Sequence, residues 1–73
     1  MIEKIPFLHR KKMYNIIIRD DISFDALHEI LDTLIDQEAF VGEREDAVLY
    51  TLVCQEIKYT VAVDGIDVMI VNA

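Results

Sequence analysis

Residues 47–71 contain the feature that most restricts the fold: runs rich in β-branched and aromatic residues, separated by very short turn signals. Two-residue connections between such runs are typical of β-hairpins. We therefore predict consecutive antiparallel strands in this part of the chain. The expected strands are 47–54, 57–63 and 66–71, and the expected turns are Gln55-Glu56 and Asp64-Gly65.

Both turns predict the same division of side chains between the two faces of the sheet. The first turn pairs Cys54 with Ile57, and the second pairs Val63 with Ile66. A slip of one residue would move every side chain to the other face, so the agreement of two hairpins favours this register. The face expected to lie in the core consists of Val48, Tyr50, Leu52, Cys54, Ile57, Tyr59, Val61, Val63, Ile66, Val68 and Ile70.

A helix is predicted from Phe24 to about Gln37. Ser23 is suited to cap its first turn, and Asp25 has the charge that a helix N-terminus favours. At about 100° per residue, the apolar side chains of this segment gather in one arc that can cover a sheet. They are Phe24, Leu27, Ile30, Leu31, Leu34 and Ile35. Gly42 is a candidate for the helix C-terminal cap or for the turn that follows.

These elements predict an α+β fold. Residues 12–19 read as a further strand, so the expected architecture is a two-layer β-α-β-β-β sandwich, with one helix packed on a mainly antiparallel four-stranded sheet. A strand joined to the sheet through a helix should pair in parallel. The sequence leaves open whether this first strand lies beside the second or the fourth predicted strand. We expect one small domain over 1–73, with an N-terminal arm at 1–11 and the α+β core at 12–73.

Size and cysteine content favour association with another chain. A domain of 73 residues buries only about 60% of its unfolded surface. Cys54 is the only cysteine, so no intrachain disulfide can form, and no Cys/His set has the spacing of metal ligands. We expect no metal and no cofactor. With 53% hydrophobic residues, the chain is expected to be a homo-oligomer, most simply a homodimer.

The sheet face that points away from the helix is the first candidate binding surface. A solvated face of an antiparallel sheet should be mostly polar, whereas this one carries several apolar residues. They are Ile17, Leu49, Val53, Met69 and Val71. We expect self-association or binding of a protein partner here. The alternative is that Ile5, Phe7 and Leu8 of the arm fold back over this face.

The second candidate surface is an acidic ridge on the helix, formed by Asp25, Glu29, Asp32 and Asp36. The helix has no Lys or Arg, so these acids lack the Glu–Lys pairs that usually relieve repulsion on a helix. A basic partner surface would offset it. The alternative function is therefore an inhibitor or decoy, of the kind found in phages and mobile elements, that mimics DNA. With a net charge of −7, direct binding of nucleic acid is not expected.

Catalysis is not expected. Cys54 falls on the core face, where a thiol is inert, and Ser23 is explained as a cap. His9 lies in the predicted arm and His28 at the border of the helix's apolar arc. A single cysteine and the absence of a signal-peptide pattern or a long apolar run favour the cytoplasm, with no membrane segment. The predicted function is thus a small acidic, non-catalytic protein-binding protein that self-associates through the open sheet face.

Overall fold

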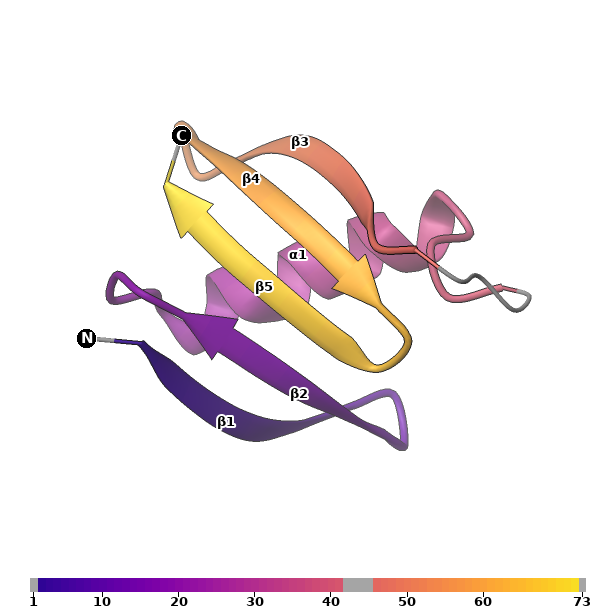
Figure 1. The fold of residues 1–73 in the computed structure, drawn as a ribbon. Coiled ribbons are helices and arrows are strands. Elements are labelled where there is room, and N and C mark those ends of the chain that lie inside the picture. Colours follow the sequence, from indigo (N-terminus) through magenta and orange to yellow (C-terminus); the bar gives the residue numbers. More distant parts are fainter. Residues whose placement is uncertain (1, 42–45, 73) are drawn as a thin grey trace.

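The computed structural model describes residues 2–41 and 46–72, which form five strands and one helix. The helix lies against one face of the sheet and leaves the other face uncovered by it (Figure 1). The elements are β1 (Glu3–His9), β2 (Lys12–Ile18), α1 (Phe24–Asp36), β3 (Val48–Cys54), β4 (Ile57–Asp64) and β5 (Asp67–Asn72).

The sheet has the order β1-β2-β5-β4-β3. Strands β2 and β5 pair in parallel, and the other neighbours pair antiparallel. The predicted α+β class is confirmed, whereas the predicted four-stranded sheet is wrong in detail because the sheet has five strands, one pair of which is parallel. The open question of the predicted first strand is settled: β2 lies beside β5, the last strand in the chain.

The predicted N-terminal arm is wrong, because residues Glu3–His9 form the edge strand β1. This strand pairs with β2 along its whole length, for example Ile5 with Ile16. The connection is Arg10-Lys11, whose φ angles are 50° and 67°. Two residues with positive φ match the type I′ turn, which usually contains Asn or Gly. Arginine and lysine give no such signal, so the hairpin is not evident from the sequence.

The two predicted hairpins differ in accuracy. In the β3–β4 hairpin, Cys54 pairs with Ile57 as predicted. In the β4–β5 hairpin, Asp64 pairs with Asp67, so the turn is Gly65-Ile66 and the register is shifted by two residues from the predicted one. Gly65 has φ +63°, which places the glycine at the first turn position. A shift of two residues preserves the side-chain parity, so the predicted faces remain correct.

The core lies between α1 and the predicted inner face of the sheet. Most of that face is buried, although Ile57, beside the β3–β4 turn, and Ile66, in the β4–β5 turn, are 45% and 55% exposed. In the helix, Leu27, Ile30, Leu31 and Leu34 are buried as predicted, while Phe24 is 67% exposed. The buried apolar residues are Tyr14, Ile16, Ile18, Ala26, Leu27, Ile30, Leu31, Leu34, Ala39, Leu52, Cys54, Tyr59, Val61, Val63, Val68 and Ile70.

Both helix ends have identifiable caps. Ser23 Oγ accepts a hydrogen bond from Ala26 N at 3.2 Å, which confirms the predicted N-cap. At the other end, Glu38 has φ 58°, and Ala39 N donates to Leu34 O at 2.9 Å. The helix therefore ends with a residue in the left-handed conformation, a position where glycine is usual. The predicted cap at Gly42 lies outside the described residues.

Turn positions with positive φ provide a test of the backbone geometry. Glu56 has φ 67°, so Glu56→Gly should stabilise the fold by about 0.5–1 kcal/mol. The strain energy relieved when the left-handed residue loses its Cβ exceeds the free-energy cost of glycine's greater entropy in the unfolded chain. Gly65→Ala should destabilise by a similar amount, since no atom lies within 4 Å of the added Cβ and only the backbone cost remains. Urea unfolding of both variants measures the change, and shifts of the same sign would contradict these turn conformations.

Candidate functional site

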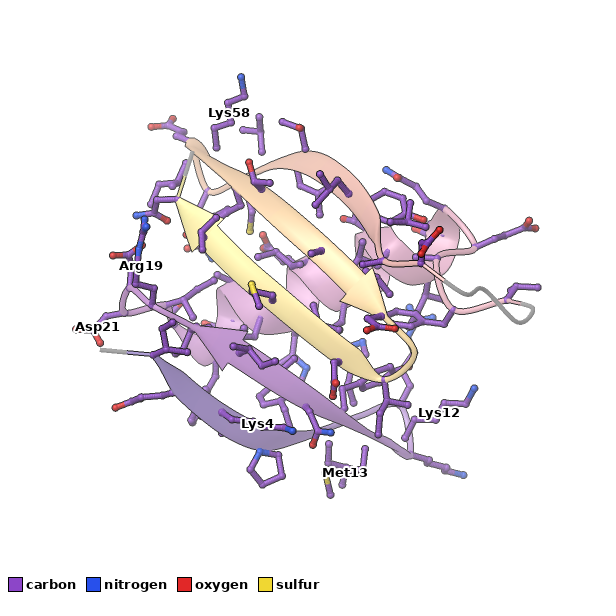
Figure 2. All side chains as sticks on the ribbon, viewed as in Figure 1. Lys4, Lys12, Met13, Arg19, Asp21 and Lys58 are labelled. Atoms are coloured by element: carbon purple, nitrogen blue, oxygen red, sulfur yellow. The ribbon has the colours of Figure 1, made fainter. Side chains whose placement is uncertain are left out.

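The open face, meaning the sheet face that points away from α1, carries all five residues of the predicted apolar patch. Figure 2 looks onto this face. Leu49 and Val53 are 71% and 73% exposed, Met69 is 46% exposed, and Ile17 and Val71 are half-buried. Their backbone partners align them across the sheet. A continuous row runs Leu49, Ala62, Met69, Ile17 and Lys4, crossing from β3 to β1.

The segment before β2 does not cover the open face. Ile5 and Phe7 are half-buried and pack against the core on the helix side of β1. Leu8 is 60% exposed and pairs with Met13, which is 53% exposed. Instead of hiding the apolar row, the N-terminal residues widen the sheet and add apolar area to its exposed side.

Polar groups border the apolar row. Asn15 Nδ2 donates a hydrogen bond to Asp67 Oδ1 at 2.9 Å, between the parallel strands β2 and β5. On the other side, Thr51 pairs with Thr60. Lys58, labelled in Figure 2, lies next to Val53 across the β3–β4 pair. An exposed apolar strip with a polar rim is the arrangement typical of a protein-binding surface.

The acidic ridge is divided by contacts within the chain. Glu29 Oε2 accepts a hydrogen bond from the Cys54 thiol at 2.8 Å, toward β3. Asp32 Oδ1 lies 2.7 Å from His9 Nε2 and 3.0 Å from an Arg10 guanidinium nitrogen, toward the β1–β2 turn. Within residues 2–41 and 46–72, neither Asp25 nor Asp36 forms an ion pair or a side-chain hydrogen bond. Among the described residues, the ridge therefore has two engaged carboxylates between two that make no such contact.

Sequence reasoning missed a chain of polar contacts that links the β1–β2 turn to the helix. His9, the last residue of β1, is buried, and its Nδ1 lies 2.6 Å from His28 Nδ1. The other ring nitrogen of His9 faces Asp32. The hydrogen bond from His9 lowers the pKa of Asp32, burial opposes this, and the charge of Arg10 adds to the lowering. The chain was missed because His9 was assigned to an arm instead of a strand.

The geometry limits the protonation of this histidine pair. His9 Nε2 donates to the Asp32 carboxylate, and its Nδ1 either accepts a hydrogen bond from His28 Nδ1 or donates one to it. The hydrogen bond between the two Nδ1 atoms requires one of them to carry a lone pair. It therefore cannot form when both rings are doubly protonated. The Phe7 ring, 4.8 Å from the His28 ring, closes the cluster on one side. These contacts tie β1 to α1.

The described residues contain few elements of a catalytic site. Cys54 is buried, and burial together with the Glu29 hydrogen bond raises the pKa of its thiol from 9.0 to about 11, so the thiol is neutral. Cys54 lies on β3 and His9 on β1, the two opposite edges of the sheet, which keeps the cysteine away from His9. Ser23 is engaged as a helix cap. No group of three His, Cys, Asp or Glu among the described residues is placed to hold a metal ion.

A hollow of about 240 Å³ lies beside the β1–β2 turn. The Tyr14 and Phe40 rings, 4.9 Å apart, form part of its apolar wall. Its charged groups are of both signs, since Arg10, Lys12 and Glu38 all line it. Arg10 is in addition paired with Asp32. This mixture defines no ligand charge, so the hollow does not indicate a particular substrate.

Comparisons with known proteins leave the function to be argued from this geometry, because no protein-family model, no curated protein and no solved structure matches the chain. In the part of the chain that the structure describes, the helix is too short and too polar to cross a membrane.

Proposed function

We propose that this protein is a small acidic, non-catalytic interaction protein that self-associates through the open face of its sheet. The observation that carries the proposal is the exposed apolar row that crosses the sheet from Leu49 to Ile17. When a partner covers apolar surface of this kind, the complex is stabilised by about 25 cal/mol for each Å² removed from water. A second copy supplies the same apolar surface and is always present.

Two further observations support a binding role. Among the described residues, Ser23 is engaged as the helix cap and the buried Cys54 thiol is held neutral beside Glu29, so neither is placed as an activated nucleophile. Small domains also tend to gain stability from a partner subunit when no disulfide or metal is available. Both point to contacts between proteins, and neither requires bond-making chemistry.

The alternative, a DNA-mimicking inhibitor, is supported less well by the geometry. Such a protein should present its carboxylates as a regular negative row, as phosphates do. Here Arg10 partly neutralises Asp32, and Glu29 turns toward Cys54. The decoy function stays a prediction. It requires binding to a basic partner that weakens steeply with added salt.

Val53→Asp tests the proposed function. Val53 is 73% exposed at the margin of the open face, so a carboxylate there should leave the fold intact and increase the dissociation constant for self-association at least about tenfold. The matched control is Ile66→Asp, which places the same charge at a 55% exposed apolar residue in the β4–β5 turn, outside the paired strands of the sheet. Sedimentation equilibrium over a range of concentrations measures both constants, and circular dichroism checks the helix.

Two results would contradict the proposal. One is a wild-type chain that remains monomeric at every concentration tested. The other is an equal effect of Val53→Asp and Ile66→Asp, since a general increase in negative charge would then explain the loss.

A further inference from the structure

The two edge strands of the sheet, β1 and β3, offer backbone groups to a further strand. In an antiparallel pair, residues alternate between those whose N–H and C=O groups bond to the neighbouring strand and those whose groups point away from it. The residues that flank a two-residue turn form a bonded pair. Cys54 and Ile57 flank the turn of the β3–β4 hairpin, and His9 and Lys12 flank the turn of the β1–β2 hairpin. The outward groups of each edge can therefore be assigned.

On β3, the outward backbone groups belong to Leu49, Thr51 and Val53, which alternate with the residues bonded to β4. All three side chains are exposed on the open face. The strand, with the sequence VLYTLVC, contains no charged residue and no proline. Its pairing with β4 is continuous from Val48 to Cys54, so no bulge disturbs the edge.

On β1, the same alternation gives outward positions to Lys4, Pro6 and Leu8. Pro6 has no N–H group, so the central donor of this edge is missing. Lys4 adds an exposed charge beside it. Proline and lysine on an edge strand are devices that prevent pairing with another chain. Among the described residues, the sheet thus has one blocked edge, β1, and one edge, β3, whose outward backbone groups have no strand partner.

We propose that a second copy of this chain pairs with β3 in antiparallel orientation, with Thr51 opposite the partner's Thr51. This inference rests on the proposed self-association and assigns it to the β3 margin of the open face. A two-fold axis at Thr51 places Leu49 opposite the partner's Val53, and Val53 opposite the partner's Leu49. The pairing satisfies the outward groups of all three residues with about six backbone hydrogen bonds.

The side chains fit this arrangement on both faces. On the open face, the most exposed residues of the predicted apolar patch, Leu49 and Val53, become cross-strand neighbours across the axis. On the helix face, half-buried Tyr50 comes opposite the partner's Leu52. The two sheets join into one, and the contact covers Leu49 and Val53 at the β3 margin of the open face.

Charge repulsion limits the strength of this dimer. The register brings Asp46 close to the partner's Glu56, and each copy has a net charge of −7. Added salt should therefore strengthen self-association. This is the opposite of the salt dependence that the decoy function requires.

The experiment compares Thr51→Lys with Thr60→Lys. Thr51→Lys places two ammonium groups across the axis and should increase the dimer dissociation constant at least about tenfold. Thr60 pairs directly with Thr51 but lies on the inner strand β4, so the same charge there should leave the constant nearly unchanged. Thr51→Pro is a second variant, because it removes an outward N–H without removing a bond to β4. Sedimentation equilibrium at low and high salt measures each constant.

Amide hydrogen exchange, measured by NMR at low and high protein concentration, locates the contact. In the dimer, exchange of the Leu49, Thr51 and Val53 amides should slow as concentration rises, while the Lys4 and Leu8 amides on the blocked edge should not change. If Thr60→Lys and Met69→Asp abolish the dimer and Thr51→Pro does not, the copies associate face to face; edge pairing is then overturned and the proposed function stands. A wild-type chain that is monomeric throughout overturns both.

Discussion

Leu31→Ala is expected to remove about 2–5 kcal/mol from the free energy of unfolding, by deleting buried methyl groups and leaving a cavity. Leu31 is 0% exposed, in the core between α1 and the sheet. A chain of 73 residues has a total stability of only about 4–11 kcal/mol. The substitution therefore takes a large share of the stability, and a measurable unfolded population should appear at 37 °C.

Phe24→Ala is the matched control. Phe24 belongs to the same predicted apolar arc, but it is 67% exposed and its ring contacts Phe7 at a centroid distance of 5.9 Å. Its loss should cost no more than about 1.5 kcal/mol, the size of an aromatic pair contribution. Urea unfolding followed by circular dichroism measures both variants. Equal costs would show that α1 is rotated from the position described.

Cys54 is expected to react with iodoacetamide about 100-fold more slowly in the folded protein than in the unfolded chain at about pH 8. The thiolate is the reactive species, and a rise in pKa from 9.0 to about 11 reduces its fraction by that factor. Limited access to the buried sulfur slows the reaction further. Mass spectrometry of samples quenched over time, with and without urea, measures the ratio.

The pKa shift also predicts the direction of a pH effect on stability. Burial is the largest cause of the raised Cys54 pKa, followed by Glu29, so folding favours the protonated thiol. Its contribution is fully present below pH 9 and is lost as the pH rises toward about 11. Burial raises the pKa of Tyr59 as well, which adds to the alkaline loss. In Glu29→Gln, alkylation should become faster but stay well below the unfolded rate. A folded-state rate equal to the unfolded rate would contradict the buried thiol.

Side-chain parity explains why most of the fold was readable from the sequence. The β3–β4 turn and the apolar alternation each place Leu52, Tyr59 and Val61 on one face, and any error of two residues leaves that face unchanged. The predicted β4–β5 register was wrong by two residues. Because a shift of two leaves each side chain on the same face, the predicted core was not affected. Ser23 and the helix period were equally legible, because capping and amphipathicity are local properties.

The strand β1 was not readable, because its signals are weak and its stability is tertiary. Pro6 interrupts the strand pattern, and Arg10-Lys11 lacks the residues expected in a type I′ turn. What holds the strand is its ladder with β2, the packing of Phe7 near α1, and the His9 contacts with His28 and Asp32. The α1 residues that contact Phe7 and His9 are 17 to 23 residues away in sequence, beyond the reach of a local pattern.

The sequence alone determined the helix, the composition of the open face and the positions of the ridge acids, because period and alternation depend only on neighbouring residues. Only the tertiary structure decided how these parts are used. It placed β2 beside β5, widened the sheet with β1, and turned Glu29 and Asp32 toward opposite edges of the sheet. It also made β3 an edge strand, with outward Leu49, Thr51 and Val53. Whether a strand is internal or at an edge depends on which distant segment pairs with it, and that is settled by packing of the whole chain.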